Sequence, residues 1–123
     1  MKDLIIEMEQ YASLHNVPII EKESITFIMK YIKANKIKNI LEIGSAIGYS
    51  AILMASTAQD VTVTTIERDD TRYMECLKNV KKCGFEQKIN VVFQDALDVN
   101  LTDVIYDLIF IDAAKSQSIK FFE

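Results

Sequence analysis

The spacing of hydrophobic residues divides the chain into two helices followed by an alternation of strands and helices. The two helices are expected at residues 2–14 and 22–35, and Pro18 separates them because it disfavours helical backbone in the residue before it. The second helix carries apolar residues at the i, i+3, i+4, i+7 spacing of one helical face; these are Ile25, Ile28, Met29 and Ile32. Residues 1–36 are therefore predicted to form an N-terminal helical segment.

From residue 37 onward, short apolar runs alternate with longer amphipathic stretches. Strands are expected at residues 39–43, 61–66, 89–93 and 106–112, and helices at 49–58, at 69–83 and from Ser116 onward. Strands that alternate with helices are typical of a parallel sheet with right-handed crossovers. The fold class predicted for residues 37–123 is therefore α/β, a Rossmann-like three-layer sandwich of which about four parallel strands are present.

The helix at residues 69–83 shows an amphipathic pattern that predicts its buried face. Apolar side chains expected to point inward are Tyr73, Met74, Leu77 and Val80. Gly84 follows the last of these turns, where glycine commonly ends a helix.

Composition and charge exclude several classes of protein. The chain is 50% hydrophobic with a net charge of −4, which argues against nucleic-acid binding by bulk electrostatics. No apolar run approaches the roughly 20 residues of a membrane span, and the acidic N-terminus is no signal peptide. A cytoplasmic protein with free thiols at Cys76 and Cys83 is therefore expected. His15 is the only histidine, so a metal cluster built from several histidines is excluded.

Glycine is scarce, and two of the three glycines lie in one strand-to-helix turn, which is Glu42-Ile43-Gly44-Ser45-Ala46-Ile47-Gly48. Ligands of parallel α/β sheets bind beyond the carboxyl ends of the strands. The turn lacks the lysine of a phosphate-binding P-loop, and Ala46 breaks the GxGxxG dinucleotide fingerprint. The remaining pattern, Glu-x-Gly-x-x-x-Gly, indicates an S-adenosylmethionine loop. A tight turn with glycines for packing is the alternative.

Acidic residues follow the other predicted strands as well. Glu67 ends the second strand, where Rossmann-like folds place an acid that accepts the ribose hydroxyls. Asp95 and Ala96 end the third strand, where an adenine would be held. Asp112 ends the fourth and is either a ligand for a hard cation such as Mg²⁺ or the N-cap of the next helix. Lys115 is either a general base or a surface lysine.

These motifs together resemble a known family. The runs ILEIGSAIGYS, TTIERD, QDAL and YDLIFIDAAKSQSIKFFE are similar to those of metal-dependent O-methyltransferases related to catechol and caffeoyl-CoA methyltransferases. The bacterial branch, which includes tRNA 5-hydroxyuridine methyltransferases, is the most similar. The resemblance covers the chain from about Asn16 onward. In some members an acid that contacts the cofactor stands in the place of Ala114, so that contact is missing here.

The resemblance implies the roles of the site residues. Cofactor-binding residues are expected at Glu42, Gly44, Ser45, Gly48, Ser50, Glu67, Asp95 and Ala96. Asp112 would be a metal ligand and substrate contact, and Lys115 matches the lysine proposed as base in catechol methyltransferases. The family's further metal ligands, an adjacent Asp-Asn pair on the next strand, are absent from this sequence. We therefore expect the 123 residues to bind cofactor without turnover.

The implied reaction moves the sulfonium methyl of S-adenosylmethionine to a hydroxyl whose neighbouring oxygen shares a divalent cation, with Mg²⁺ expected. The substrate would be a catechol-type small molecule or the 5-hydroxyuridine of tRNA. Lysines that could contact RNA phosphates are Lys30, Lys33, Lys36 and Lys38, although a solvated helix face is the favoured interpretation. Two other classes stay open: a nucleotide-binding oxidoreductase domain and a non-catalytic binding or assembly module.

The predicted strand at residues 106–112 also bears on assembly. Without a neighbour on its outer side it would present unpaired backbone groups, and such an edge invites pairing with another chain. A homodimer is therefore expected.

Overall fold

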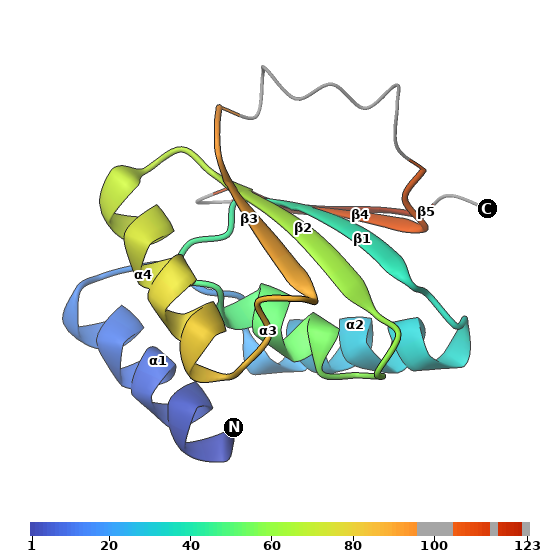
Figure 1. Ribbon diagram of the computed structural model, residues 1–123, viewed down its shortest axis with the longest axis horizontal. Helices are drawn as coiled ribbons and strands as arrows, with labels where there is room; N and C mark the ends of the chain where they lie inside the picture. Colours follow the sequence, from blue (N-terminus) through green and yellow to red (C-terminus); the bar gives the residue numbers. More distant parts are fainter. Residues whose placement is uncertain (96–104, 114–115, 122–123) are drawn as a thin grey trace.

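The computed structural model describes residues 1–95, 105–113 and 116–121, with side chains for 1–95 and 105–111. Its elements are α1 (Lys2–Leu14), α2 (Lys22–Ala34), β1 (Asn39–Ile43), α3 (Tyr49–Ala55), β2 (Thr62–Glu67), α4 (Asp70–Lys82), β3 (Ile89–Phe93), β4 (Leu108–Ala113) and β5 (Ser116–Phe121) (Figure 1). Every helix and strand predicted before residue 114 is found near its expected place. The α/β class is thus confirmed.

The strands form one sheet in the order β3-β2-β1-β4-β5. The first four are parallel, and their registers bring the carboxyl ends of neighbouring strands level: Ile43 lies beside Ile66 and Ile111, and Glu67 lies beside Phe93. The chain leaves β1 toward β2 and returns on the other side as β4, so the strand order reverses at β1. Such a switch point is where α/β sheets bind their ligands.

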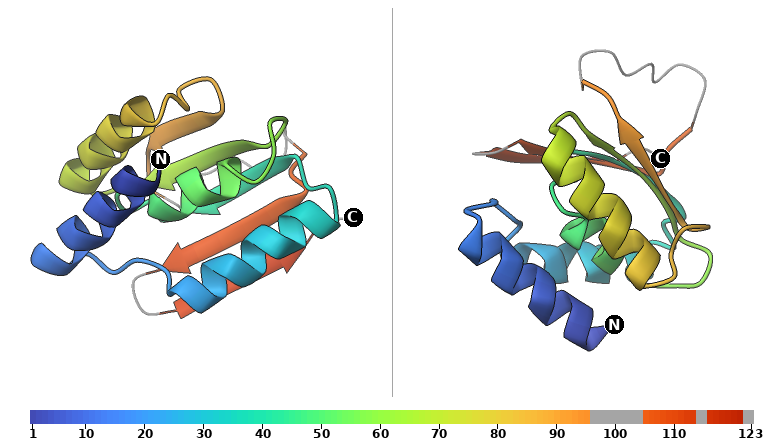
Figure 2. Two further views of the ribbon diagram at one scale, coloured as in Figure 1. Left: turned by 90° about the horizontal axis from the view of Figure 1, so that it is seen from below. Right: turned by 60° about the vertical axis from the view of Figure 1, so that its left-hand side comes forward.

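The helices that the structure describes all lie on one side of the sheet (Figures 1 and 2). They form one helical layer of the predicted sandwich. The core beneath them joins α2, α3 and the sheet through fully buried side chains such as Ile32, Ile52 and Phe110. A smaller cluster around Leu41 and Ile66 lies on the other face of the sheet. Within the described ranges, no helix combines the length and apolarity that crossing a membrane requires.

The buried face of α4 differs from the prediction. Met74 and Leu77 are 57% and 37% exposed, whereas Cys76, Asn79 and Val80 are buried. The apolar pattern misled because Asn79, a polar residue, faces inward. Its side-chain amide donates a hydrogen bond to the carbonyl of Ile47 at 2.8 Å, which satisfies the group inside the core.

The helix predicted from Ser116 onward is wrong, because residues 116–121 form strand β5. It runs antiparallel to β4, with Ala113 paired to Ser116 and Leu108 paired to Phe121. The pairing satisfies the outer backbone groups of β4, which a helix would leave open. The prediction that β4 has an open outer edge is therefore wrong too, since β5 pairs with that edge.

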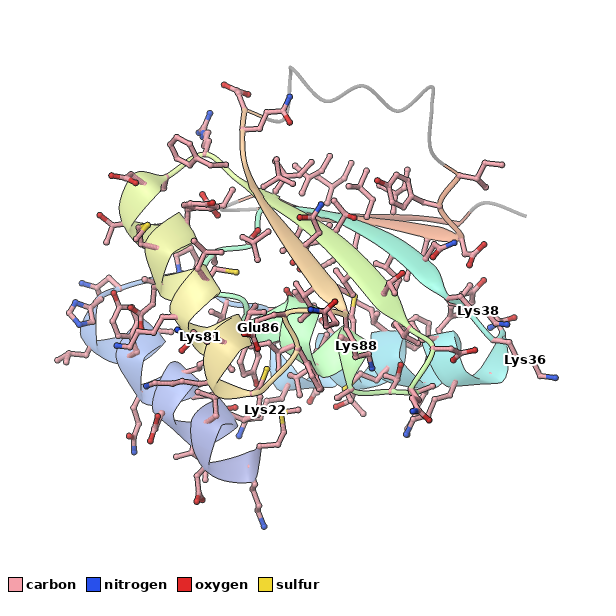
Figure 3. The ribbon with its side chains drawn as sticks, viewed as in Figure 1. Lys22, Lys36, Lys38, Lys81, Glu86 and Lys88 are labelled. Atoms are coloured by element: carbon pink, nitrogen blue, oxygen red, sulfur yellow. The ribbon has the colours of Figure 1, made fainter. Side chains whose placement is uncertain are left out.

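The carboxyl end of α3 comes three residues earlier than predicted, at Ala55. The Ser56 and Thr57 hydroxyls donate to the carbonyls of Leu53 and Met54 and turn the chain away from the helix. Lys88, labelled beside α3 in Figure 3, then donates to the carbonyls of Ala55 and Ala58. A cation at a helix carboxyl end favours that end both by charge and by hydrogen bonding.

Asp107 joins the start of β4 to the start of β1 and should make stability depend on pH. Its carboxylate accepts the Lys38 and Asn39 amides, both at 3.0 Å, and these bonds lower the pKa of Asp107. Because the pKa of Asp107 is lower in the folded than in the unfolded protein, its carboxylate stabilises the fold at pH values above about 3.9, the unfolded pKa. This stabilisation is lost as the pH falls through the folded pKa. We expect Asp107→Asn to lower the free energy of unfolding by about 0.5–1 kcal/mol at pH 7, and by less toward pH 3.

Urea titrations at pH 7, 5 and 3 measure this difference. Asp60→Asn is the control, because its exposed carboxylate has an ion pair with Lys38 at 3.5 Å and both side chains are more than half exposed. A difference between Asp107→Asn and the unaltered chain that stays constant with pH would contradict the assignment.

Candidate functional site at the carboxyl edge of the sheet

The glycine turn between β1 and α3 folds over the end of β2. Gly44 and Gly48 have φ angles of +97° and +93°, in the region that favours glycine. The amides of Gly44 and Ser45 donate to the Ile66 carbonyl at 2.8 and 3.1 Å, and the Gly48 amide donates to the Ser45 carbonyl at 2.9 Å. The turn is therefore held at the carboxyl edge of the sheet by backbone bonds.

Helix α4 supports this turn from behind. A Cβ at Gly48 would lie 3.0 Å from the Cys76 sulfur, so only glycine fits without displacement. Asn79 holds the neighbouring Ile47 carbonyl. Burial, followed by the charges of Glu42 and Glu67, raises the pKa of the Cys76 thiol. A buried thiol held in its protonated form is a packing group and not a nucleophile.

Glu42 lies beneath the turn and is fully buried. Thr65 Oγ1 donates to its Oε1 at 2.6 Å, and Ser50 Oγ donates to its Oε2. Ser45 Oγ lies 2.5 Å from Thr65 Oγ1 and extends the network. A charge removed from water needs such partners. Three predicted cofactor residues, Glu42, Ser45 and Ser50, thus belong to one buried polar cluster with Thr65.

Glu67 ends β2 beside the turn and is 7% exposed. Its Oε1 accepts the Ala46 amide at 2.7 Å, and its Oε2 accepts the Arg68 and Asp69 amides at 3.1 and 2.9 Å. A carboxylate oxygen has two lone pairs, and Oε1 has a single protein donor among the described residues. It can therefore accept one further hydroxyl without losing a bond, whereas a second hydroxyl on Oε2 would have to replace an amide.

The other predicted site residues are placed less completely. The Gln94 amide donates to the Glu67 carbonyl at 3.0 Å, which brings the half-buried Asp95 to the same edge. Asp112 lies in β4, paired with Gln117, and its side chain is outside the described part. Ala96 and Lys115 also lie outside the described residues. Among the residues that the structure describes, no group of three or more His, Cys, Asp or Glu side chains could hold a metal ion.

Several residues of the site were not found from sequence. Thr65 and Asn79 lie in regular elements far along the chain from the turn, and Glu9 lies in α1, where its carboxylate accepts the Tyr49 hydroxyl at 2.7 Å. An inward-facing polar residue in a strand or helix is the one signal that could have indicated Thr65 and Asn79.

The described edge carries a glycine turn and the carboxylates of Glu42, Glu67 and Asp95, an arrangement suited to a ligand with hydroxyls and a positive charge. Comparisons with known proteins identify the family of the chain. The family model for O-methyltransferases matches residues 1–123. A curated relative, the flavonoid 3′,5′-methyltransferase of Vitis vinifera, is 33% identical over 108 residues, which are 87% of this chain and 44% of the relative.

Solved structures agree as well. A candidate caffeoyl-CoA O-methyltransferase from Staphylococcus aureus matches with a TM-score of 0.84 and 40% identity, covering 91% of this chain and 55% of that one. An O-methyltransferase from Bacillus cereus, solved in complex with SAH (S-adenosylhomocysteine), matches with a TM-score of 0.80 and 26% identity, covering 90% and 54%. The chain thus spans about half the length of its relatives.

The fold is the Rossmann-like fold of methyltransferases. Within that class, the chain belongs to the O-methyltransferase family, the group that includes caffeoyl-CoA and catechol methyltransferases.

Proposed function

We propose that this chain binds S-adenosylmethionine at the carboxyl edge of its sheet, as the cofactor part of an enzyme that methylates a hydroxyl oxygen. The observation that carries the proposal is the bonding of Glu67 to the glycine turn above the buried Glu42. When bound, this cofactor supplies an activated methyl group on a positively charged sulfur.

The residues at this edge would divide the work of binding. Glu67 would accept a ribose hydroxyl on Oε1, and its amide bonds fix the carboxylate in one orientation. Glu42 would place negative charge below the turn, which favours a cationic ligand in a site of low dielectric. Gly44 and Gly48 would let the ligand approach the backbone closely. Asp95 and Ala96 would lie next to the adenine.

The acceptor would be a small molecule with two neighbouring oxygens, such as a catechol. Relatives named for flavonoid and catechol substrates support this class over the 5-hydroxyuridine of tRNA. Asp112 would be one ligand of a divalent cation, with Mg²⁺ expected. The charge of that cation would lower the pKa of a substrate hydroxyl. Lys115 would accept the proton of that hydroxyl as a neutral amine, a form that the charge of the neighbouring cation would favour. Because the chain spans about half of its relatives, we propose that it binds cofactor without turnover by itself.

A fusion of this chain to the remaining half of the Staphylococcus aureus relative tests the proposal. Transfer of labelled methyl from S-adenosylmethionine to a catechol, and to tRNA that contains 5-hydroxyuridine, is measured with Mg²⁺ or with EDTA. The expected result is Mg²⁺-dependent labelling of the catechol by the fusion and none by the chain alone. A folded fusion that binds S-adenosylhomocysteine and labels neither acceptor would instead indicate a non-catalytic module.

A further inference from the structure

We propose that Glu9 of helix α1 is a positioning residue, which holds the cofactor turn in place through its hydrogen bond with Tyr49. The inference rests on the proposed function and deepens it, because it assigns a role in cofactor affinity to a helix far in sequence from the glycine turn.

Tyr49 lies where the glycine turn meets helix α3. It is the first residue of α3 and lies between Gly48 and Ser50, whose hydroxyl donates to Glu42. Its side chain is 3% exposed, and its hydroxyl donates to Glu9 Oε2 at 2.7 Å. Burial and the neighbouring Glu9 raise the pKa of Tyr49 to about 12, so the hydroxyl keeps its proton at neutral pH.

Glu9 is itself held on a second side. Lys22, at the start of α2 and labelled in Figure 3, lies 3.6 Å from the same Oε2 atom. Because the Lys22 side chain is 79% exposed, this ion pair is weak. The bond to Tyr49 is shorter and partly buried, since Tyr49 is 3% exposed and the Glu9 side chain 25% exposed. Hydrogen bonds to ionised groups are about twice as strong as neutral ones. Glu9 therefore acts mainly on Tyr49.

The Glu9 bond complements the support from α4. On one side of the turn, the Asn79 amide donates to the Ile47 carbonyl, and Cys76 lies where a Cβ on Gly48 would meet its sulfur. On the other side, the start of α3 is packed into the core, and the Ser50 bond to Glu42 and the Tyr49 bond to Glu9 are side-chain bonds that orient it. Without Glu9, the first turn of α3 would gain freedom where Gly48 and Ser50 meet the ligand. A site whose backbone becomes ordered only when the ligand binds has a lower affinity, because the ordering costs free energy.

The experiment titrates S-adenosylhomocysteine into the full chain and its variants by calorimetry. Tyr49→Phe and Glu9→Ala are each expected to weaken affinity about 5–10-fold, the equivalent of about one net hydrogen bond. The double variant should be no weaker than either single one. Glu9→Gln keeps an acceptor oxygen and should stay within about threefold, and Lys22→Ala should bind as the unaltered chain does.

Amide hydrogen exchange distinguishes a positioning role from a purely structural link between α1 and α3, because a purely structural link would not change the exchange rates of α3 alone. Amides in the first turn of α3 should exchange faster in Tyr49→Phe and Glu9→Ala, while those of α2 and α4 keep their rates. If Tyr49→Phe fails to fold, the comparison of Glu9→Ala with Glu9→Gln decides.

Two outcomes overturn the inference alone. They are affinity that is unchanged in both single variants, and losses that add in the double variant. An unaltered chain that is folded and does not bind overturns the proposed function and this inference with it.

Discussion

Gly48→Ala is expected to lower the free energy of unfolding by about 2–4 kcal/mol. The residue has a φ of +93°, which costs alanine strain. The added Cβ would also lie 3.0 Å from the Cys76 sulfur, so that side chain would have to move by a few tenths of an ångström, whereas its 3.7 Å distance from the Cys76 Cα is ordinary contact. Urea denaturation followed by circular dichroism measures the change.

Gly84→Ala is the matched control for the backbone term. Its φ is +75°, but a Cβ there would meet nothing within 4 Å. It should therefore cost only about 1 kcal/mol. In a chain that already carries Cys76→Ala, the Gly48→Ala change should lower the free energy of unfolding by less than it does in the unaltered chain, since the contact with the sulfur is gone. Equal losses at the two glycines would show that the contact with α4 does not constrain the turn.

Glu42→Ala is expected to destabilise the protein by about 3 kcal/mol, the cost of breaking a buried, hydrogen-bonded charge network. Ser50 would lose the acceptor of its hydroxyl, and the space of a fully buried side chain would be left behind. Thr65 would keep its contact with Ser45. Glu42→Gln fills the same space and keeps one carbonyl oxygen, so it should lose about half as much.

Thermal and urea unfolding of both variants, compared with Glu86→Ala, test this assignment. Glu86 is exposed (Figure 3), and its replacement should change stability by less than about 0.5 kcal/mol. A loss in Glu42→Ala as small as that of Glu86→Ala would contradict the structural role given to the buried carboxylate.

The parallel sheet was predictable because its signals are local. The β-branched run before Glu67 and the apolar run before Gly44 each identify a buried strand by composition alone. Residues 116–121 had no such signal. Their conformation is decided by pairing with β4, and whether a short polar segment helps to close a sheet edge depends on partners that the local sequence does not show.

The placement of the candidate site residues was predictable to a similar depth. Glycine spacing and the acids that end strands identified Glu42, Gly44 and Glu67, and the structure brings these residues to one edge. The residues that hold them were not predicted, since Thr65 lies 23 residues from Glu42 and Asn79 lies 32 residues from Ile47. Such bonds follow from packing between elements, which the pattern of one element cannot specify. The binding and catalytic roles predicted for the site residues, Glu67, Asp112 and Lys115 among them, remain predictions.

The most direct test of the central claim is a calorimetric titration of S-adenosylhomocysteine into this chain and into Glu67→Ala, with and without Mg²⁺. The account predicts saturable binding by the unaltered chain, at least about tenfold weaker in Glu67→Ala, because a hydrogen bond to a charged group is worth about 1.5–3 kcal/mol. Circular dichroism establishes that both proteins are folded. Absence of binding by the folded chain, or equal affinity in Glu67→Ala, would contradict the claim that the edge formed by Glu42, the glycine turn and Glu67 binds the cofactor.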